Sequence, residues 1–255
     1  VFEELGAKVT SLSVTPDGTN INRRCGALHP ELMAETVRKE GADIGLAFDG
    51  DGDRLIVCDE KGQIVDGDHI MAICAKDLLK QRKLRKKTLV ATVMSNMGLE
   101  VAMEEMGGSL LRTAVGDRYV VESMRKNGCS FGGEQSGHLV FIDHITTGDG
   151  ALAGLQLLSV MRKLDRPLSE LASIMESFPQ VLKNVRTSTR MNVSEIPHFL
   201  TTQRKLEEKL DGTGRILVRP SGTEPVIRVM VEGQDEKQVI SLANRLADVV
   251  AAAAA

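Results

Sequence analysis

The sequence is poor in aromatic residues: it has no tryptophan, one tyrosine and six phenylalanines among 255 residues. Its basic run, "KQRKLRKK" at 80–87, contains no aromatic residue, and the formal net charge of the chain is −3. Surfaces that bind nucleic acid are usually strongly positive, and those that bind single strands offer aromatic rings on which bases stack. The run also follows an amphipathic stretch, and cations are favourable in the last turn of a helix. We interpret it as a solvated helix end and expect no nucleic-acid partner.

Cysteines and long hydrophobic runs are also scarce. The four cysteines, Cys25, Cys58, Cys74 and Cys129, form no CxxC pair, which is typical of free thiols in a reducing compartment. No apolar run reaches the roughly 20 residues that a membrane-spanning helix needs. The first residues, "VFEELGAKV", do not resemble a signal peptide. We therefore expect a cytoplasmic protein without a membrane partner.

Strand-like and helix-like segments alternate along most of the chain. A hydrophobic content of 42% and a charged content of 26% are ordinary for a globular protein. Strand-like runs at 8–14, 42–48 and 54–65, followed by further strands that alternate with helices, predict α/β domains with doubly wound parallel or mixed sheets. After Pro179 the order strand, helix, strand, strand, helix predicts a small α+β domain. We expect domains at 1–66, 67–178 and 179–255.

The run "DGDGDR" follows an apolar segment and places Asp49, Asp51 and Asp53 at alternate positions. Three carboxylates this close repel one another unless a cation neutralises them. Oxygen ligands suit Mg²⁺ or Ca²⁺, and the glycines between them let the backbone fold so that the side chains converge. An EF-hand loop is excluded, because its sixth position needs glycine and holds Arg54, and because strands flank the run. We predict a metal site, with a polar turn as the alternative.

A second polar loop, "GGEQSGH" at 132–138, also follows a predicted strand. Open α/β sheets bind ligands at the carboxyl ends of their strands. Glu134 and Ser136 are suited to hydrogen bonds with the hydroxyl groups of a polar ligand, and His138 is suited to proton transfer near neutral pH. Ser136 lacks the G-x-S-x-G frame of a nucleophile elbow. The loop is a candidate ligand site, and an ordinary turn is the alternative.

A third loop, "RPSGTEP", lies between two predicted strands near the C-terminus. It concentrates hydrogen-bond donors: the guanidinium of Arg219, the hydroxyls of Ser221 and Thr223, and the amide of Gly222. Such a set suits a phosphate group. Arg228 alternates with apolar neighbours on the following strand and could add another cation. We predict a phosphate site, with a hairpin turn as the alternative.

In this order and with these gaps, the three loops resemble those of the α-D-phosphohexomutase superfamily. "DGDGDR" is similar to its metal-binding loop, "GEQSGH" to its sugar-binding loop and "RPSGTEP" to its phosphate-binding loop. The stretches "PDGTNINRRCGALHPE", "TAVGDRYV" and "TTGDG" are most similar to the bacterial members that act on glucosamine phosphate. The resemblance extends over almost the entire chain, and jointly its motifs are highly specific.

The resemblance implies four domains, the first of which carries a phosphorylated serine in a T-A-S-H-N-P-like loop. No such sequence occurs in this chain, which also begins without an initiator methionine. What is present resembles the second half of domain two, followed by domains three and four. We therefore expect a fragment of a longer protein that is inactive by itself. Since many members are dimers, the resemblance also allows a homodimer.

The reaction implied by the resemblance is an intramolecular phosphate transfer. The phosphoserine gives its phosphate to glucosamine 6-phosphate, and the resulting 1,6-bisphosphate turns around and returns the other phosphate, leaving glucosamine 1-phosphate. One Mg²⁺ per chain, held by the three aspartates, would neutralise charge on the transferring phosphoryl group, and Arg54 would add positive charge nearby. Glucose or glucosamine 1,6-bisphosphate would serve as the activator.

The resemblance also implies roles for individual side chains. Glu134 and Ser136 would bind sugar hydroxyls, and Arg118 in the "GDRY" stretch would line the sugar site. His138 is the candidate general acid/base. The loop that begins at Arg219 would bind the phosphate that does not react, on a movable domain, because the site must serve both orientations of the intermediate.

Two alternatives stay open. The same loops would serve a phosphomannomutase or phosphoglucomutase, which differs in the sugar it accepts. Without its serine, the chain would instead be a non-catalytic module that binds Mg²⁺ and a phosphosugar. Turnover of the different hexose phosphates, and calorimetric titration of the phosphosugar beside an activity assay, would separate these possibilities.

Overall fold

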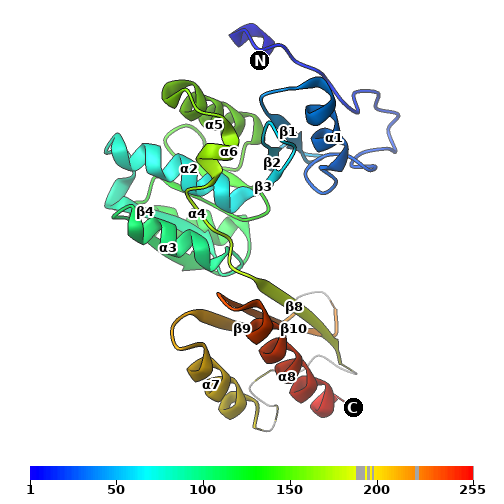
Figure 1. Ribbon diagram of the computed structural model, residues 1–255, viewed down its shortest axis with the longest axis vertical. Coiled ribbons are helices and arrows are strands. Elements are labelled where there is room, and N and C mark those ends of the chain that lie inside the picture. The colour runs from blue at the N-terminus through cyan, green and yellow to red at the C-terminus, as the bar shows by residue number, and fades with distance from the viewer. Residues whose placement is uncertain (188–192, 194–195, 197, 222–223, 255) are drawn as a thin grey trace. The chain divides into compact units, whose positions relative to one another are not determined.

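The chain divides into two compact units. The computed structural model describes residues 1–187, 193, 196, 198–221 and 224–254. One unit consists of residues 1–95 and 99–176, and the other of 96–98 and 177–255 (Figure 1). Each unit has its own hydrophobic core.

The first unit begins with a segment that lacks regular strands. The short 3-10 helix η1 (Glu3–Leu5) comes first, and residues 8–14, predicted as a strand, are exposed and form none. That prediction is wrong for a physical reason. The backbone groups of a strand must pair with a neighbouring strand, and in the described part of the chain none lies alongside this segment, so β-branched composition by itself is insufficient.

A small antiparallel sheet carries the aspartate run. Its strands, in the order β1-β2-β3, are β1 (Gly45–Phe48), β2 (Leu55–Cys58) and β3 (Ile64–Val65). Helix α1 (Glu31–Glu40) packs its apolar face on this sheet and ends at Gly41, whose left-handed backbone favours glycine. The connection between β1 and β2 therefore presents residues 49–54 as a hairpin turn.

The larger sheet of this unit has the strand order β5-β4-β6-β7. The strands are β4 (Thr88–Thr92), β5 (Ser109–Thr113), β6 (Phe131–Gly133) and β7 (Leu139–Phe141). β4 pairs in parallel with β5 and β6, whereas β7 runs antiparallel to β6. The α/β class with a mixed sheet is confirmed, although the sequence pattern does not predict the short edge strand β7.

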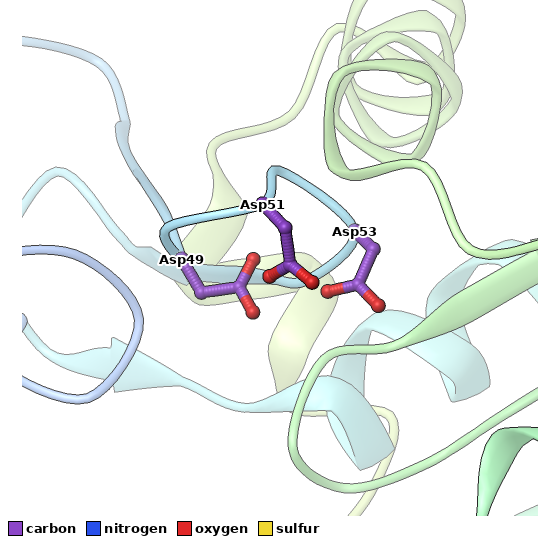
Figure 2. Close-up of side chains that lie close together, drawn as sticks. All are labelled: Asp49, Asp51 and Asp53. Atoms are coloured by element: carbon purple, nitrogen blue, oxygen red, sulfur yellow. The ribbon is translucent and has the colours of Figure 1, made fainter. Parts of the chain in front are cut away.

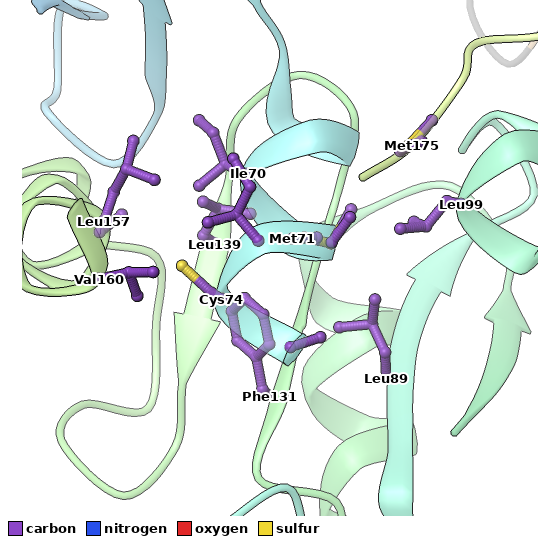
Figure 3. Packing of buried hydrophobic residues seen from close by; sticks show 14 of the residues in the cluster. Ile70, Met71, Cys74, Leu89, Leu99, Phe131, Leu139, Leu157, Val160 and Met175 are labelled. Carbon is purple, nitrogen blue, oxygen red and sulfur yellow. The ribbon is translucent and has the colours of Figure 1, made fainter. Parts of the chain in front are cut away.

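Helices cover both faces of this sheet. They are α2 (Gly67–Lys80), α3 (Met97–Glu105), α4 (Asp117–Asn127), α5 (Gly150–Leu164) and the short α6 (Leu168–Ala172), with the 3-10 turn η2 (Arg85–Lys87) before β4. Val90 of β4 packs in one hydrophobic cluster with Val120 and Met124 of α4. Its neighbours Leu89 and Ala91 pack in the core shared with α2 and α5 (Figure 3). Alternate side chains thus enter opposite layers, which is why strands buried on both faces appear as continuous apolar runs.

Two of these helices are capped by aspartates. Oδ1 of Asp66 accepts a hydrogen bond from the His69 amide (3.2 Å) at the start of α2. Oδ1 of Asp149 accepts one from the Leu152 amide (2.9 Å) at the start of α5. A carboxylate at this position satisfies an unpaired N–H group and is favoured by the helix dipole. Each cap also fixes the loop that leads into its helix.

The cysteines are free, and three of them, Cys58, Cys74 and Cys129, are buried. Burial raises the pKa of Cys58 to about 11 and that of Cys74 to about 12. Figure 3 shows Cys74 on α2 among the apolar side chains of the core. These thiols therefore stay protonated and act as small hydrophobic groups, as expected from their scattered positions.

The second unit is an antiparallel sheet with two helices. Its strands, in the order β8-β10-β9, are β8 (Gln180–Arg186), β9 (Gly214–Pro220) and β10 (Val226–Gly233), and its helices are α7 (Phe199–Leu210) and α8 (Glu236–Ala254). Val239, Leu242 and Leu246 of α8 are buried in its core. This is the α+β class expected for the C-terminal part. The sequence predicts that the first helix of this unit runs from about residue 194 to 210; residue 194 lies outside the described residues. None of the described helices combines the length and the apolar character that crossing a bilayer requires.

Candidate functional site

The turn between β1 and β2 brings the three aspartates together. Asp49, Asp51 and Asp53 each offer one carboxylate oxygen, and these oxygens lie within 4.8 Å of one another (Figure 2). The Asp49 side chain is 9% exposed and that of Asp53 is 29% exposed, whereas Asp51 faces solvent. Gly52 has a φ of 74°, a left-handed backbone that lets the turn close.

The aspartates have opposite pKa shifts. Burial opposes the charge of Asp49, but hydrogen bonds, above all from the Arg54 amide to Oδ1 (3.0 Å), outweigh it and lower the pKa of Asp49. Burial, followed by the neighbouring Asp49, raises the pKa of Asp53. Oδ1 of Asp53 is buried and has no hydrogen-bond partner among the described residues. A cation at this point would satisfy it and relieve the repulsion.

Arg54 lies beside these carboxylates. Its Nε is 3.6 Å from Oδ2 of Asp49 and 4.0 Å from Oδ1 of Asp53, and the side chain is 41% exposed. Within the described residues this Nε makes no hydrogen bond. The Nε atom itself is buried against the two carboxylates, so the guanidinium supplies positive charge at the aspartate turn.

The loop between β6 and β7 holds Glu134 and Ser136. Oε1 of Glu134 accepts a hydrogen bond from the Gly116 amide (2.9 Å), and Oε2 accepts one from the Ser136 hydroxyl (3.3 Å). Glu134 is half-buried and Ser136 is exposed. An acceptor and a donor thus lie side by side where a ligand with hydroxyl groups could reach both.

Backbone contacts join this loop to the aspartate turn. The Leu55 amide donates to the Gly137 carbonyl (3.0 Å), and Arg54 and His138 form an isolated antiparallel bridge. Gly137 has a φ of 92°, and a side chain there would overlap the backbone of Leu55. Two loops that are far apart in the sequence therefore form one continuous surface.

His138 lies beneath that surface. Its side chain is 3% exposed, and its Nε2 lies 3.4 Å from Oδ2 of Asp53 and 4.0 Å from Oδ2 of Asp117. Neither ring nitrogen has a hydrogen-bond partner that meets the usual geometry among the described residues. The imidazole is thus directed at a predicted metal ligand. Its role as a general acid/base stays a prediction.

Three residues near His138 are not singled out by sequence analysis. Asp117 faces the imidazole, and a side chain at Gly148 would overlap it. The amide of Gly150 donates to the carbonyl of Gly52 (2.9 Å), so the first residue of α5 is hydrogen-bonded to the aspartate turn. These residues belong to the "TAVGDRYV" and "TTGDG" stretches. The resemblance marks both stretches, but nothing local in the sequence indicates what they contact.

Arg118 contacts its own helix. Its side chain is 78% exposed, and its Nε donates to Oε1 of Glu122 (2.8 Å), one turn further along α4. The amide of the nearby Gly116, by contrast, donates a hydrogen bond to Glu134 of the candidate sugar loop. A role for Arg118 in the sugar site therefore stays a prediction.

In the second unit, Arg219 and Arg228 lie opposite each other on β9 and β10. Burial, followed by the charge of Arg228, lowers the pKa of Arg219. Nε of Arg228 is buried and has no hydrogen-bond partner among the described residues. Two neighbouring guanidinium groups, one with an unsatisfied donor, form a site that a phosphate would stabilise.

The loop after β9 is described in part. Ser221 is 6% exposed; its amide donates to the Val226 carbonyl (2.7 Å) and its hydroxyl accepts from the Glu224 amide (3.4 Å). Ser221 therefore closes the turn between β9 and β10. Gly222 and Thr223, the other predicted donors, lie outside the described residues.

Family comparisons cover most of the chain. Models of the phosphoglucomutase/phosphomannomutase family match it in three consecutive parts: alpha/beta/alpha domain II over residues 1–62, alpha/beta/alpha domain III over 66–178 and the C-terminal domain over 182–249. Each of the three loops lies within one of these parts.

Individual relatives agree with the family models. The chain is 69% identical over 250 residues to the phosphoglucosamine mutase of Desulfotalea psychrophila, and 58% identical over 250 residues to that of Pelobacter propionicus. These matches cover 98% of this chain but 56% and 55% of the two relatives. The chain thus spans about half the length of the relatives it matches.

Solved structures have the same fold. A phosphoglucomutase/phosphomannomutase family protein from Burkholderia thailandensis superposes with a TM-score of 0.78 at 25% identity, over 99% of this chain and 56% of that one. The Aspergillus fumigatus N-acetylphosphoglucosamine mutase in complex with GlcNAc-6P and magnesium superposes with a TM-score of 0.71 at 21% identity, over 90% of this chain and 57% of that one. The three family models, which match consecutive parts over most of the chain, show that it belongs to the phosphoglucomutase/phosphomannomutase family.

Proposed function

We propose that this chain provides the metal, sugar and phosphate sites of a phosphoglucosamine mutase, an intramolecular phosphotransferase that interconverts glucosamine 6-phosphate and glucosamine 1-phosphate. One observation carries the proposal. Three converging carboxylates adjoin the Glu134–Ser136 loop in a chain that is 69% identical to a phosphoglucosamine mutase.

The aspartate turn fits Mg²⁺. Its donors are all carboxylate oxygens, they lie within 4.8 Å of one another, and a buried oxygen of Asp53 has no partner among the described residues. Hard oxygen ligands of this kind suit Mg²⁺. We propose one Mg²⁺ per chain on Asp49, Asp51 and Asp53. When bound, it would supply neutralisation of the charge on the transferring phosphoryl group.

The side chains around this turn would hold the sugar. Glu134 would accept hydrogen bonds from sugar hydroxyls and Ser136 would donate one, while Arg54 would attract the phosphate that reacts. His138 stays the candidate for proton transfer. The ring is buried and its Nε2 lies 3.4 Å from Oδ2 of Asp53. The carboxylate of Asp53, rather than bulk water, would therefore be the immediate partner of His138.

Arg219 and Arg228 would bind the phosphate that does not react. The reaction passes through a 1,6-bisphosphate whose two phosphates exchange places, so this site must accept either end of the intermediate. A pair of guanidinium groups suits that task, because it recognises phosphate without contacting the sugar. Glucose or glucosamine 1,6-bisphosphate would accordingly act as the activator, and one solved Aspergillus fumigatus relative is a complex with glucose 1,6-bisphosphate.

The phosphate donor implied by the family is a phosphoserine in a T-A-S-H-N-P-like sequence, and these 255 residues contain no such sequence. We therefore expect no turnover by this chain alone. The test is ³¹P NMR of the chain with Mg²⁺, glucosamine 6-phosphate and a trace of the 1,6-bisphosphate. A version extended at its N-terminus should form glucosamine 1-phosphate. If the extended version forms none, the mutase proposal is wrong; turnover by this chain alone would locate the donor within it.

A second candidate function differs from the first in the sugar phosphate that the enzyme accepts. The matching family models carry the names phosphoglucomutase and phosphomannomutase, so glucose and mannose phosphates are the alternative substrates. The extended enzyme should turn over glucosamine 6-phosphate faster than glucose 6-phosphate or mannose 6-phosphate. The opposite order would favour the second candidate.

We also propose that the enzyme is cytoplasmic, with a phosphosugar as its partner and no nucleic-acid or membrane partner. Free buried thiols agree with a reducing compartment. The homodimer stays a prediction, which analytical ultracentrifugation of the extended protein would test.

A further inference from the structure

Asp66 links helix α2 to the sugar-binding loop. Its Oδ2 accepts a hydrogen bond from Nε2 of Gln135 (3.3 Å), and its Oδ1 caps α2 through the His69 amide (3.2 Å). The same Oδ1 lies 2.8 Å from Nδ1 of His69. One carboxylate thus holds the start of a buried helix and the side chain in the middle of the loop.

The backbone reinforces this link. The Gly67 amide donates to the Gln135 carbonyl (3.0 Å). A side chain at Gly67 would overlap the carbonyl of Glu134 and would lie 2.8 Å from the amide nitrogen of Gly137. Only glycine therefore allows the first residue of α2 to lie directly against the loop.

His69 completes the arrangement. Burial opposes its charge, but the hydrogen bond and charge of Asp66 outweigh that effect and raise the pKa of His69. Burial likewise opposes the charge of Asp66, yet His69 lowers the pKa of Asp66. A backbone hydrogen bond with Met175 also favours the protonated imidazole. The ion pair therefore keeps the Asp66 carboxylate charged and fixed in position.

Gln135 stands between the two predicted sugar ligands, Glu134 and Ser136. It is anchored twice, through its carbonyl and through its side-chain amide. Each of these bonds holds Gln135 against α2, so Gln135 contributes to the conformation of the loop. Because the backbone is continuous, the position of Gln135 determines where the carboxylate and hydroxyl on either side of it lie.

We propose that Asp66, His69 and Gln135 act as positioning residues that hold the sugar-binding loop in its binding conformation, and we call them the loop brace. The inference rests on the proposed function, because it concerns the same sugar site. It assigns no contact with the sugar to the brace itself. Loss of the brace should therefore weaken sugar-phosphate binding and leave the aspartate turn able to bind Mg²⁺.

A polarity swap tests the brace. In Asp66→Asn the new side chain still caps α2, because asparagine is as good an N-cap as aspartate. The asparagine has no negative charge to pair with His69, and its NH2 group can bond Gln135 only if the Gln135 amide turns over to present Oε1. Adding Gln135→Glu supplies an acceptor and restores one hydrogen bond. We expect Asp66→Asn to weaken binding of glucosamine 6-phosphate about tenfold and the double variant to recover part of that loss, because it restores the hydrogen bond to position 135 and not the ion pair with His69.

Two measurements on this chain separate an effect on ligand binding from an effect on the conformation of the loop. Calorimetry measures binding of glucosamine 6-phosphate and, separately, of Mg²⁺. Hydrogen–deuterium exchange of the amides at 134–137 reports the loop itself without any ligand. Exchange should rise in Asp66→Asn and fall again in the double variant. Asp235→Asn is the matched control, since Asp235 accepts from the Lys237 and Gln238 amides at the start of α8 in the other unit.

The results discriminate between the two proposals. If the unaltered chain binds no glucosamine 6-phosphate, the proposed function fails. If it binds the sugar phosphate but Asp66→Asn changes neither affinity nor exchange at 134–137, the brace is refuted and the proposed function stands. A double variant no better than the single one would equally overturn the brace, because the hydrogen bond to Gln135 would then not matter. An equal loss of Mg²⁺ affinity would indicate general misfolding and also count against it.

Discussion

Nε2 of His138 lies 3.4 Å from Oδ2 of Asp53, and the imidazole is 3% exposed. Gly148 leaves the space that the ring occupies, since a side chain at that position would overlap it. The orientation of a predicted metal ligand therefore depends on a glycine from the loop before α5. Partners behind a metal-binding carboxylate commonly tune the affinity of the site.

We predict that Gly148→Ala displaces His138, destabilises the first unit by about 1–3 kcal/mol and lowers Mg²⁺ affinity. The extra methyl group must displace the buried ring, because it would overlap Nε2, the atom that faces Asp53. Urea denaturation measures the free energy of unfolding, and calorimetry measures Mg²⁺ binding. Gly154→Ala is the control, because a side chain at Gly154 within α5 would make ordinary contacts at 3.5 Å or more. It should be neutral or stabilising by up to about 1 kcal/mol; a Gly148 variant that behaves the same way would contradict the prediction.

The aspartate turn should be more stable with Mg²⁺ than without it. Adding Mg²⁺ should raise the thermal midpoint of the chain, since a ligand that binds only the folded state stabilises it. Asp51→Asn should abolish most of this rise. Because Asp51 is exposed and close to two other carboxylates, its neutralisation should not lower the midpoint in the absence of metal.

Asp43→Asn removes the same charge from an exposed position just before β1 and serves as the control. Its thermal midpoint should respond to Mg²⁺ as that of the unaltered chain does. An Asp51 variant with the full response would show that the turn does not bind the ion through this residue.

The two arginines of the predicted phosphate site should destabilise the second unit when no anion is bound. Arg219 and Arg228 are cross-strand neighbours of like charge, and such pairs are destabilising. We predict that Arg228→Gln stabilises the second unit by about 0.5–1 kcal/mol and abolishes stabilisation by added inorganic phosphate. Urea denaturation with and without phosphate measures both effects. Arg204→Gln on the exposed side of α7 should change neither; a destabilised Arg228 variant that still responds to phosphate would refute the assignment.

The Asp66–His69 pair should make stability depend on pH. The pKa of His69 is raised above its ordinary 6.5, so its contribution is fully present below that value and is lost as the pH rises through the folded-state pKa. The pKa of Asp66 lies below its ordinary 3.8, so its contribution is present above that value and is lost as the pH falls through the folded-state pKa. The pair therefore stabilises the first unit most between these limits.

His69→Gln should accordingly lower the free energy of unfolding more at about pH 5 than at about pH 9. Urea denaturation at both pH values measures the difference. His29→Gln alters an exposed histidine and should show no such contrast. A deficit for His69→Gln that is equal at the two pH values would argue that the imidazole is only packed, and not charged, in the folded protein.

The parts of the candidate site that were predictable from the sequence are those whose residues lie within one short segment of the chain. Asp49, Asp51 and Asp53 converge because one hairpin turn contains all of them, and alternate positions in a closed turn bring side chains together. The caps at Asp66 and Asp149 are local in the same way. The contact between Asp66 and Gln135 joins residues 69 positions apart, and no local rule indicates it. The predicted strand at 8–14 is wrong because a strand needs a neighbouring strand to pair with, and the local sequence cannot show whether one is present.

By itself, the sequence determined the α/β class, the family and the chemical character of the three loops, because apolar periodicity and the spacing of carboxylates, glycines and arginines are properties of short segments. Tertiary structure alone decided that the imidazole of His138 faces Asp53 and that Arg118 pairs with Glu122. It also decided that α2 lies at Gly67 against the loop predicted to bind the sugar. These are contacts between surfaces. They depend on how strands register and helices pack, and the free energy of that packing is shared among residues that are distant in the chain.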